Sequence, residues 1–258
     1  MILLFDIGNT HTHVGLANGR RVLRHVNLPT EGWGKRRNLE GLKDFAGRSR
    51  IEGGALCSVV PKRTNAVREA LSGLGEICCV ELTSETGAGI GIHYPRPKTI
   101  GPDRLANAIA AKAKHGAPAL VVDFGTAVTF DVVDRKGDYV GGVIAPGISA
   151  MTDYLHEKTA LLPKIEIRDT KANIGKNTEQ AMRIGAVHGY RGLIREIVGG
   201  IKRELKARRL PVIATGGCAK LIAKGIPEIT EVDPLLTLEG LRLVWQAGLP
   251  QPSRQPRG

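Results

Sequence analysis

MILLFDIGNTHTHVGL, residues 1–16, joins an apolar run to a short polar turn and a second apolar run. Ile2 to Phe5 have the length of a buried strand, and Asp6 stands at its end. Gly8 lets the backbone approach an anion closely. Backbone N–H groups and the Thr10 hydroxyl can donate to phosphate oxygens, while Asp6 can hold Mg²⁺ against them through water. The stretch therefore predicts a phosphate-binding hairpin, with an ordinary hairpin and a polar turn as the alternative.

A second copy of this pattern fills residues 119–142, ALVVDFGTAVTFDVVDRKGDYVGG. An apolar strand again ends in an aspartate, Asp123, and Gly125 and Thr126 follow in the same kind of turn. Such a repeat indicates two similar halves. We expect an α/β fold with two domains of mixed sheet, residues 1–115 and 116–248, and a nucleotide cleft between them. Residues 249–258 are expected to form a disordered tail.

Composition narrows the protein class. The 258 residues are 42% apolar and 24% charged, which is typical of a folded globular protein. No apolar run reaches about eighteen residues, and the chain begins with a strand rather than a basic leader. We therefore expect a cytoplasmic protein with no membrane partner. Its four cysteines lack metal-ligand spacing and are expected to be reduced and mostly buried.

The formal net charge of +12 has two interpretations. One is a nucleic-acid-binding surface. The other is a solvated basic surface that also attracts anionic small molecules. The basic clusters at residues 35–37 and 202–209 have no interleaved aromatic residues that could stack on bases. We therefore expect no nucleic-acid partner.

Strands and helices alternate along both halves, as in α/β domains. In the first half we expect strands over 20–27, 53–60 and 76–82, and helices over 39–46 and 62–74. In the second half we expect a helix over 148–158, a long amphipathic helix to about 208, a strand over 210–214, and helices over 219–224 and 235–247. Thr178 precedes the long helix and is interpreted as its cap or as a donor to substrate.

Residues 101–116 place a carboxylate at the start of a helix between the two halves. Pro102 suits the first turn, and Asp103 follows where the helix dipole favours negative charge. Phosphoryl transfer to an alcohol needs a carboxylate that accepts the hydroxyl proton. Asp103 is the candidate, with Arg104 as an anion anchor. A plain helix-terminal charge and a surface cation remain the alternatives for these two residues.

The other candidate ligands lie in the two hairpins. Asp123 would bind or position a cation, and Thr126 would donate to phosphate as Thr10 does. His11 and His13 share a strand face and suggest a metal pair. A third ligand is not evident in the sequence, so this interpretation is disfavoured.

A set of short motifs, taken in order, resembles the type III pantothenate kinases. They are DIGNT (Asp6–Thr10), SVVP (Ser58–Pro61), GPDR (Gly101–Arg104) followed by NA (Asn107–Ala108), DFGTAVT (Asp123–Thr129), GGVIAPG (Gly141–Gly147), NT (Asn177–Thr178), TGG (Thr215–Gly217) and EGL (Glu239–Leu241). The likeness omits the tail and residues 29–53. The ordered set is specific, whereas single members occur across the acetate/sugar kinase, chaperone and actin superfamily.

The resemblance implies two ribonuclease-H-like, actin-like domains in a homodimer. It implies transfer of the ATP γ-phosphate to the primary hydroxyl of pantothenate, the first step of coenzyme A synthesis, with Asp103 as proton acceptor and K⁺ or NH₄⁺ at Asp123. The implied ATP-binding residues are Asp6, Ile7, Gly8, Asn9, Thr10, His11, Thr12, His13 and Thr126. The implied pantothenate-binding residues are Tyr94, Gly101, Pro102, Asp103, Arg104 and, from the neighbouring subunit, Thr178.

Two other functions remain open. The family also carries the name Bvg accessory factor, so a nucleotide-binding regulator without catalysis is one alternative. Retention of Asp6, Asp103, Asp123 and Thr126 argues against it. A kinase for another small hydroxy acid or sugar is the second alternative, which the GPDR and NT motifs disfavour. The chain departs from the family pattern at Cys218, where an acidic residue more often follows TGG.

Overall fold

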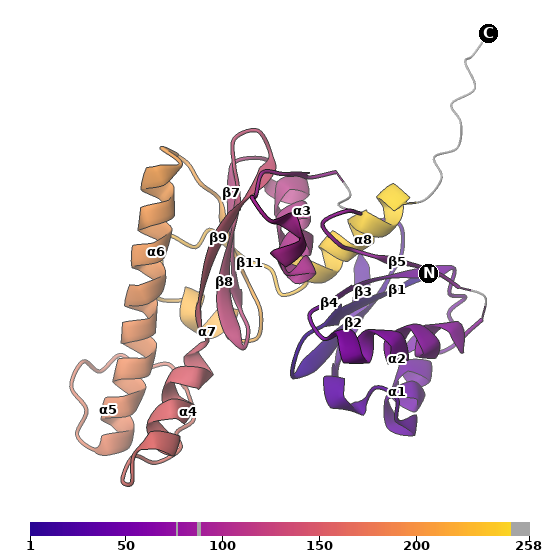
Figure 1. The fold of residues 1–258 in the computed structure, drawn as a ribbon. Coiled ribbons are helices and arrows are strands. Elements are labelled where there is room, and N and C mark those ends of the chain that lie inside the picture. The colour runs from indigo at the N-terminus through magenta and orange to yellow at the C-terminus, as the bar shows by residue number, and fades with distance from the viewer. Residues whose placement is uncertain (76, 87–88, 249–258) are drawn as a thin grey trace. The chain divides into compact units, whose positions relative to one another are not determined.

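A computed structural model describes residues 1–75, 77–86 and 89–248 of the chain (Figure 1). The chain forms two compact units. The first comprises Met1–Ile90, Arg96–Ala110 and the C-terminal helix from Thr237, and the second comprises Gly91–Pro95 and Ala111–Leu236. This division differs from a single boundary after residue 115, because the last helix packs into the first unit.

The first unit is built on a five-stranded mixed sheet in the order β3-β2-β1-β4-β5. Its strands are β1 (Ile2–Ile7), β2 (His11–Ala17), β3 (Val22–Pro29), β4 (Gly53–Ser58) and β5 (Cys78–Glu81). Strands β1 to β3 form an antiparallel meander, whereas β4 and β5 run parallel to β1. The predicted strand positions are therefore confirmed to within a few residues.

One face of this sheet is covered by α1 (Arg36–Ala46) and α2 (Pro61–Ser72) (Figure 1). Phe5 and Leu56 of the sheet meet Leu42 of α1 and Val67 of α2 in a buried apolar cluster. A short 3₁₀ turn, Thr30–Gly32, leads from β3 toward α1, and Trp33 after it joins the same cluster. Burial of this apolar surface is the main force that holds the two helices on the sheet.

The opposite face of the sheet is covered by α8 (Leu236–Gly248) (Figure 1). The Trp245 ring packs so closely on Gly53 of β4 that a Cβ there would overlap it. In α8, Gly240 likewise leaves no room for a side chain against Ala106 of α3 (Pro102–His115). Glycines at these two contacts let α8 lie close to both the sheet and α3.

The second unit repeats the strand order of the first, with one addition. Its six-stranded sheet has the order β11-β10-β7-β8-β9-β6. The strands are β6 (Gly91–Ile92), β7 (Ala119–Phe124), β8 (Ala127–Val133), β9 (Asp138–Pro146), β10 (Val212–Thr215) and β11 (Glu231–Val232). As in the first unit, three antiparallel strands are followed by two strands parallel to the first of them. Strand β6 adds to β9 in parallel.

The helices of the second unit are α4 (Ile148–Lys158), α5 (Thr178–Ile184), α6 (Tyr190–Glu204) and α7 (Ala219–Ala223). The prediction of one long helix to about residue 208 is confirmed to within a few residues. A π-helical turn over Gly185–Gly189 connects α5 to α6 without a break, and α6 ends at Glu204. The backbone keeps right-handed helical angles on both sides of this turn. The core packs Tyr190 and Ile194 of α6 against Phe130 of the sheet.

Two further expectations concern the cysteines and membranes. All four cysteines are free, but only Cys57 is buried; Cys79 and Cys218 are partly buried and Cys78 is exposed. The expectation of mostly buried thiols was therefore wrong, because Cys78 and Cys79 lie on an edge strand. Every helix in the part of the chain that the structure describes is too short or too polar to span a bilayer.

Candidate active site

Asp6 stands near the end of β1, opposite His13 of β2 and Cys57 of β4. Its carboxylate is half-buried, whereas Cys57 is buried. The Cys57 Sγ donates a hydrogen bond to Asp6 Oδ1 at 3.4 Å. The thiol therefore holds one oxygen of a carboxylate that solvent still reaches.

Asp103 lies near the same thiol. The pKa of Cys57 is raised well above its ordinary value, first by burial and then by the negative charges of Asp6 and Asp103. Both carboxylates must therefore be close enough to act on one buried sulfur atom. In the first unit, the Asp6 and Asp103 carboxylates thus both act on the buried Cys57 thiol, and their roles as Mg²⁺ ligand and base stay predictions.

The first turn of α3 fixes the Asp103 carboxylate. Its Oδ1 accepts the backbone N–H of Arg104 at 2.9 Å. A Cβ at Gly101 would overlap Asp103 Oδ1, so the glycine makes room for the carboxylate. Burial raises the pKa of Asp103, and the Arg104 N–H and guanidinium oppose that rise. A raised pKa makes an ionised carboxylate a better proton acceptor.

The predicted phosphate loop lies between β1 and β2. Its Gly8 N–H donates to His11 O at 3.1 Å, and Asn9, Thr10 and His11 are exposed. The exposed residues can reach a ligand. Two other predicted ATP-binding residues, Ile7 and Thr12, are fully buried. Ile7 belongs to the apolar cluster beneath the loop.

His13 has a different partner from the one the sequence suggested. Its Nε2 lies 2.9 Å from Nδ1 of His25 on β3, and the rings meet edge to face. Burial and the neighbouring His25 lower the pKa of His13 to about 4. His11 is exposed at the loop. No group of three or more metal-binding side chains occurs among the residues that the structure describes, so a transition-metal site at His11 and His13 has no support there.

In the second unit, Asp123 stands near the end of β7, opposite Thr215 of β10. Gly216 follows with φ of +89°, and a Cβ there would lie 2.5 Å from Asp123 Oδ1. Gly147 donates its N–H to Thr126 O at 3.1 Å and packs on the carbonyl of Gly125. A carboxylate and two backbone carbonyls thus gather at one end of the sheet.

Tyr94 belongs to the second unit and lies beside the sheet. Its ring meets Tyr139 edge to face with centroids 6.4 Å apart. A Cβ at Gly141, where φ is +120°, would lie 3.3 Å from the Tyr94 ring. Tyr94 is partly exposed, so one side of the ring remains available to a ligand.

Thr178 is the first residue of α5 and is exposed. The interpretation of Thr178 as the helix cap was wrong. Asn177 is the cap, because its Oδ1 accepts the N–H of Gln180 at 2.9 Å. Donation by the Thr178 hydroxyl to substrate stays a prediction.

Sequence reasoning missed three residues of the first unit. Cys57 contacts Asp6, His25 contacts His13, and Thr30 donates its hydroxyl proton to the Gly8 carbonyl of the phosphate loop at 2.7 Å. For Cys57 a signal was present, since it precedes the SVVP motif at the end of an apolar strand. The other two depend on the register between β2 and β3.

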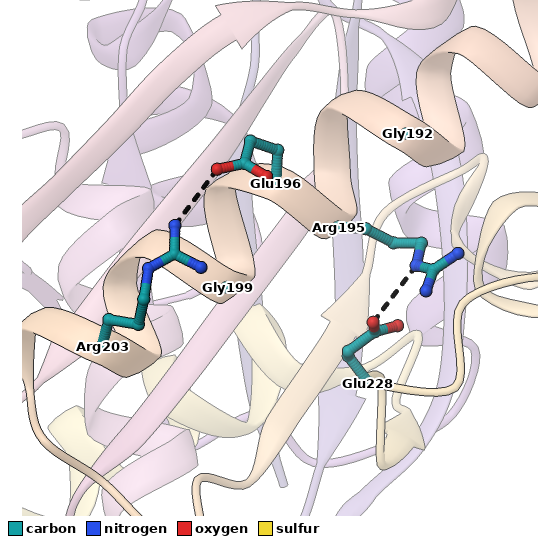
Figure 2. Close-up of a pocket in the computed structure, with 6 residues that line it drawn as sticks. All are labelled: Gly192, Arg195, Glu196, Gly199, Arg203 and Glu228. Carbon is teal, nitrogen blue, oxygen red and sulfur yellow. Dashed lines mark hydrogen bonds and ion pairs between the residues drawn. The ribbon is translucent and has the colours of Figure 1, made fainter.

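A separate surface hollow of about 420 Å³ lies along α6 (Figure 2). Gly192 and Gly199 of α6 contribute to its lining. Its charged groups pair with one another, Arg195 with Glu228 and Arg203 with Glu196, each at 3.1 Å (Figure 2). None of the predicted site residues lines it, and we do not connect it with catalysis.

Comparison with solved structures supports the fold. A Campylobacter jejuni protein described as a Baf family transcriptional activator matches with a TM-score of 0.62 at 19% identity, covering 95% of this chain and 97% of that chain. The activator of the 2-hydroxyisocaproyl-CoA dehydratase from Clostridium difficile, with bound ADPNP, matches with a TM-score of 0.51 at 12% identity, covering 95% of each chain. Together with the repeated sheets, these matches confirm the predicted two-domain actin-like architecture.

Comparison of sequences identifies the family. The model of the type III pantothenate kinases matches residues 2–199. A type III pantothenate kinase from Akkermansia muciniphila is 45% identical over 96% of this chain and 98% of its own length. One from Methylacidiphilum infernorum is 42% identical over 94% of this chain and 87% of its own length. The chain therefore belongs to the type III pantothenate kinase family.

Proposed function

We propose that this chain transfers the γ-phosphate of ATP to the primary hydroxyl of pantothenate, with Asp103 as the proton acceptor. Its family makes the chain a kinase, an enzyme of coenzyme A biosynthesis that uses ATP and a divalent metal. The observation that supports the residue assignment is that both carboxylates act on the buried Cys57 thiol, Asp6 through a hydrogen bond and Asp103 through its charge. The Asp6 carboxylate suits the metal and phosphates, and the Asp103 carboxylate suits the alcohol of pantothenate.

The proton follows a short path in this proposal. As the pantothenate oxygen bonds to the γ-phosphorus, its proton passes to the Asp103 carboxylate, and the bond to the β–γ bridging oxygen breaks to release ADP. The Arg104 N–H holds Asp103 Oδ1 at 2.9 Å, which keeps the carboxylate oriented. The Arg104 guanidinium would anchor the pantothenate carboxylate, with Tyr94, Gly101 and Pro102 lining the substrate.

The nucleotide would be held by residues 6–13, and Thr126 would be a further donor to its phosphates. Asp6 offers a half-buried carboxylate, which suits the hydration shell of Mg²⁺. Bound there, Mg²⁺ supplies positive charge that offsets the charge of the phosphates. The exposed Asn9 and Thr10 would donate to phosphate oxygens.

The oxygen donors near Asp123 fit a monovalent cation. Its carboxylate and the carbonyls of Gly125 and Thr126 are hard ligands, which K⁺ accepts and to which NH₄⁺ can donate. The space is kept open by Gly147 and Gly216, where a side chain would meet these oxygens. We therefore assign K⁺ or NH₄⁺ to Asp123.

A second copy of the chain would complete the substrate site. In the second unit, Tyr154, Leu161 and Ile174 expose 61%, 90% and 71% of their surface, which is unusual for large apolar side chains. They lie in the same stretch of chain as Thr178, so burial of this region in a homodimer would bring Thr178 to a partner. Sedimentation velocity that finds only a 27.6 kDa monomer would contradict the dimer.

A coupled assay of ADP release tests the function. Pantothenate and a panel of other small hydroxy acids are offered with Mg²⁺–ATP in buffers containing K⁺, NH₄⁺ or Na⁺ as the sole monovalent cation. Among the hydroxy acids, we expect only pantothenate to be phosphorylated. We expect this turnover only in buffers that contain K⁺ or NH₄⁺. Equal rates in Na⁺ would contradict the Asp123 assignment. Nucleotide binding without turnover of any acceptor would favour the regulator.

A further inference from the structure

A line of hydrogen bonds runs from Trp33 through Thr12 and Thr30 to the Gly8 carbonyl of the phosphate loop. Trp33 Nε1 donates to Thr12 Oγ1 at 2.8 Å, and Thr12 Oγ1 lies 3.0 Å from Thr30 Oγ1. Thr30 Oγ1 donates to the Gly8 carbonyl at 2.7 Å. The exposed fractions of Thr12, Thr30 and Trp33 are 0%, 2% and 1%, so water does not compete for the two bonds that join these residues, and the bond to Gly8 is partly buried.

The direction of this line is fixed by the chemistry of its ends. An indole N–H can only donate, and a carbonyl oxygen can only accept. Since the one hydroxyl proton of Thr30 goes to Gly8, Thr12 must donate to Thr30 and accept from Trp33. Each hydroxyl therefore gives one hydrogen bond and receives one, with no alternative arrangement of protons.

Thr30 also contacts the loop through its backbone. Its N–H donates to the Thr10 carbonyl at 3.0 Å. Thr30 therefore binds the carbonyls of Gly8 and Thr10, the two residues that flank Asn9. The Gly8–Asn9 peptide is trans. In a planar trans peptide the N–H points away from the preceding carbonyl. Holding the Gly8 carbonyl toward Thr30 therefore turns the Asn9 N–H away from Thr30.

We propose that Thr30 is a positioning residue for ATP, which holds the Gly8 and Thr10 carbonyls so that the loop presents N–H groups to the phosphates. This inference rests on the proposed role of the loop in ATP binding. Without the Thr30 hydroxyl, the Gly8 carbonyl can rotate toward a bound phosphate and repel it. Preorganised donors bind an anion better than donors that must first be turned.

In the same network, Thr12 supports Thr30 and does not contact ATP directly. Its hydroxyl is fully buried and both of its hydrogen bonds are used by Trp33 and Thr30. Thr12 therefore acts on ATP through Thr30. Trp33, which packs edge to face on Phe5 in the apolar cluster, fixes the far end of the line to the core.

The test compares three variants of the full-length protein. Thr30→Val keeps the shape but removes the hydroxyl, and Thr30→Ser keeps the hydroxyl. Thr64→Val is the control, because Thr64 is buried in the same unit and donates its hydroxyl to Ser58 Oγ at 2.8 Å. For each variant, calorimetry gives the Kd of ADP, the coupled assay gives KM for ATP and for pantothenate, and thermal melting gives the stability.

We expect Thr30→Val to weaken ADP binding and raise the KM for ATP roughly 5- to 100-fold, the range for a buried acceptor that loses its donor. The KM for pantothenate should stay within about twofold, and Thr30→Ser should recover most of the loss. Thr64→Val should lower the melting temperature without changing nucleotide affinity. Nucleotide affinity that falls equally in Thr30→Val and Thr64→Val would overturn the proposal.

If Thr30→Val does not fold, Trp33→Phe decides the question, because it removes the N–H at the far end, and the melting temperature reports the effect of the smaller ring on stability. A selective loss of ADP affinity then supports the line of hydrogen bonds, and unchanged affinity contradicts it. Calorimetry also separates this inference from the proposed function. Unmodified protein that binds ADP but does not phosphorylate pantothenate would refute the function and leave the Thr30 test valid.

Discussion

Replacing Asp103 with asparagine should lower activity without lowering stability. Asn keeps the size of the side chain and an Oδ1 that can accept the Arg104 N–H, now at 2.9 Å. It cannot accept the proton of the attacking hydroxyl. General base catalysis contributes about 10²- to 10⁴-fold in rate. We therefore expect kcat to fall by that factor, about 2.7–5.5 kcal/mol of transition-state stabilisation.

The stability change follows from the pKa of Asp103. Burial raises this pKa in the folded state, so the carboxyl contributes stability below its unfolded pKa that is lost as pH rises through its folded pKa. Above its folded pKa, the ionised carboxylate is therefore a net cost to folding. Removing that charge should leave the melting temperature unchanged or higher, despite the lost attraction to Arg104.

The assay measures kcat, the Kd of ADP and the melting temperature on the same preparation. A matched control is Asp134→Asn, because Asp134 Oδ1 also accepts backbone N–H groups, from Lys136 and Asp138, in a turn of the second unit. The control should keep its activity. The reasoning is refuted if Asp103→Asn turns over at near-normal rate, or if it loses nucleotide binding and stability together, since Asp103 would then be a structural residue.

The remaining predictions concern pH and the second unit. The pKa of Asp103 is raised, and only its ionised form accepts a proton. On acidification, kcat should therefore begin to fall at a higher pH than it would with an ordinary aspartate. A pH–rate profile that is flat down to pH 4 would contradict this. Gly216→Ala should destabilise the protein by about 1–2 kcal/mol for its φ of +89° alone, and more for a Cβ 2.7 Å from the Phe124 backbone. It should also raise the K⁺ concentration needed for half-maximal activity, since the new methyl group displaces Asp123; a normal K⁺ titration would separate Asp123 from the cation.

The internal repeat predicts the sheets well because it is written in local sequence. Apolar strands that end in Asp6 and Asp123 need no distant partner to be recognised, and both prove to be central strands of matching sheets. The start of α3 was equally readable, since Pro102 and Asp103 are local signals. The same local signals did not predict the two-residue strands β6 and β11, which are defined only by their neighbours.

What the sequence could not predict depends on contacts between distant segments. The place of α8 in the first unit is set by Trp245 against Gly53, nearly two hundred positions apart in the chain and complementary only in three dimensions. The π-helical turn between α5 and α6 occurs within a pattern that remains amphipathic throughout. The partner of His13 is set by strand register, so His25 could not be preferred over His11 from spacing alone.

The position of Cys57 explains how two carboxylates can share a small region of the first unit. An ionised third group there would repel both Asp6 and Asp103. Burial and these two charges raise the thiol pKa well above its ordinary value, so the sulfur stays protonated at neutral pH. A protonated thiol adds no charge, donates to Asp6 Oδ1 and does not compete with Asp103 for the hydroxyl proton. In the proposed mechanism, the thiol thus keeps Asp6 oriented for metal and phosphate while Asp103 acts as the base.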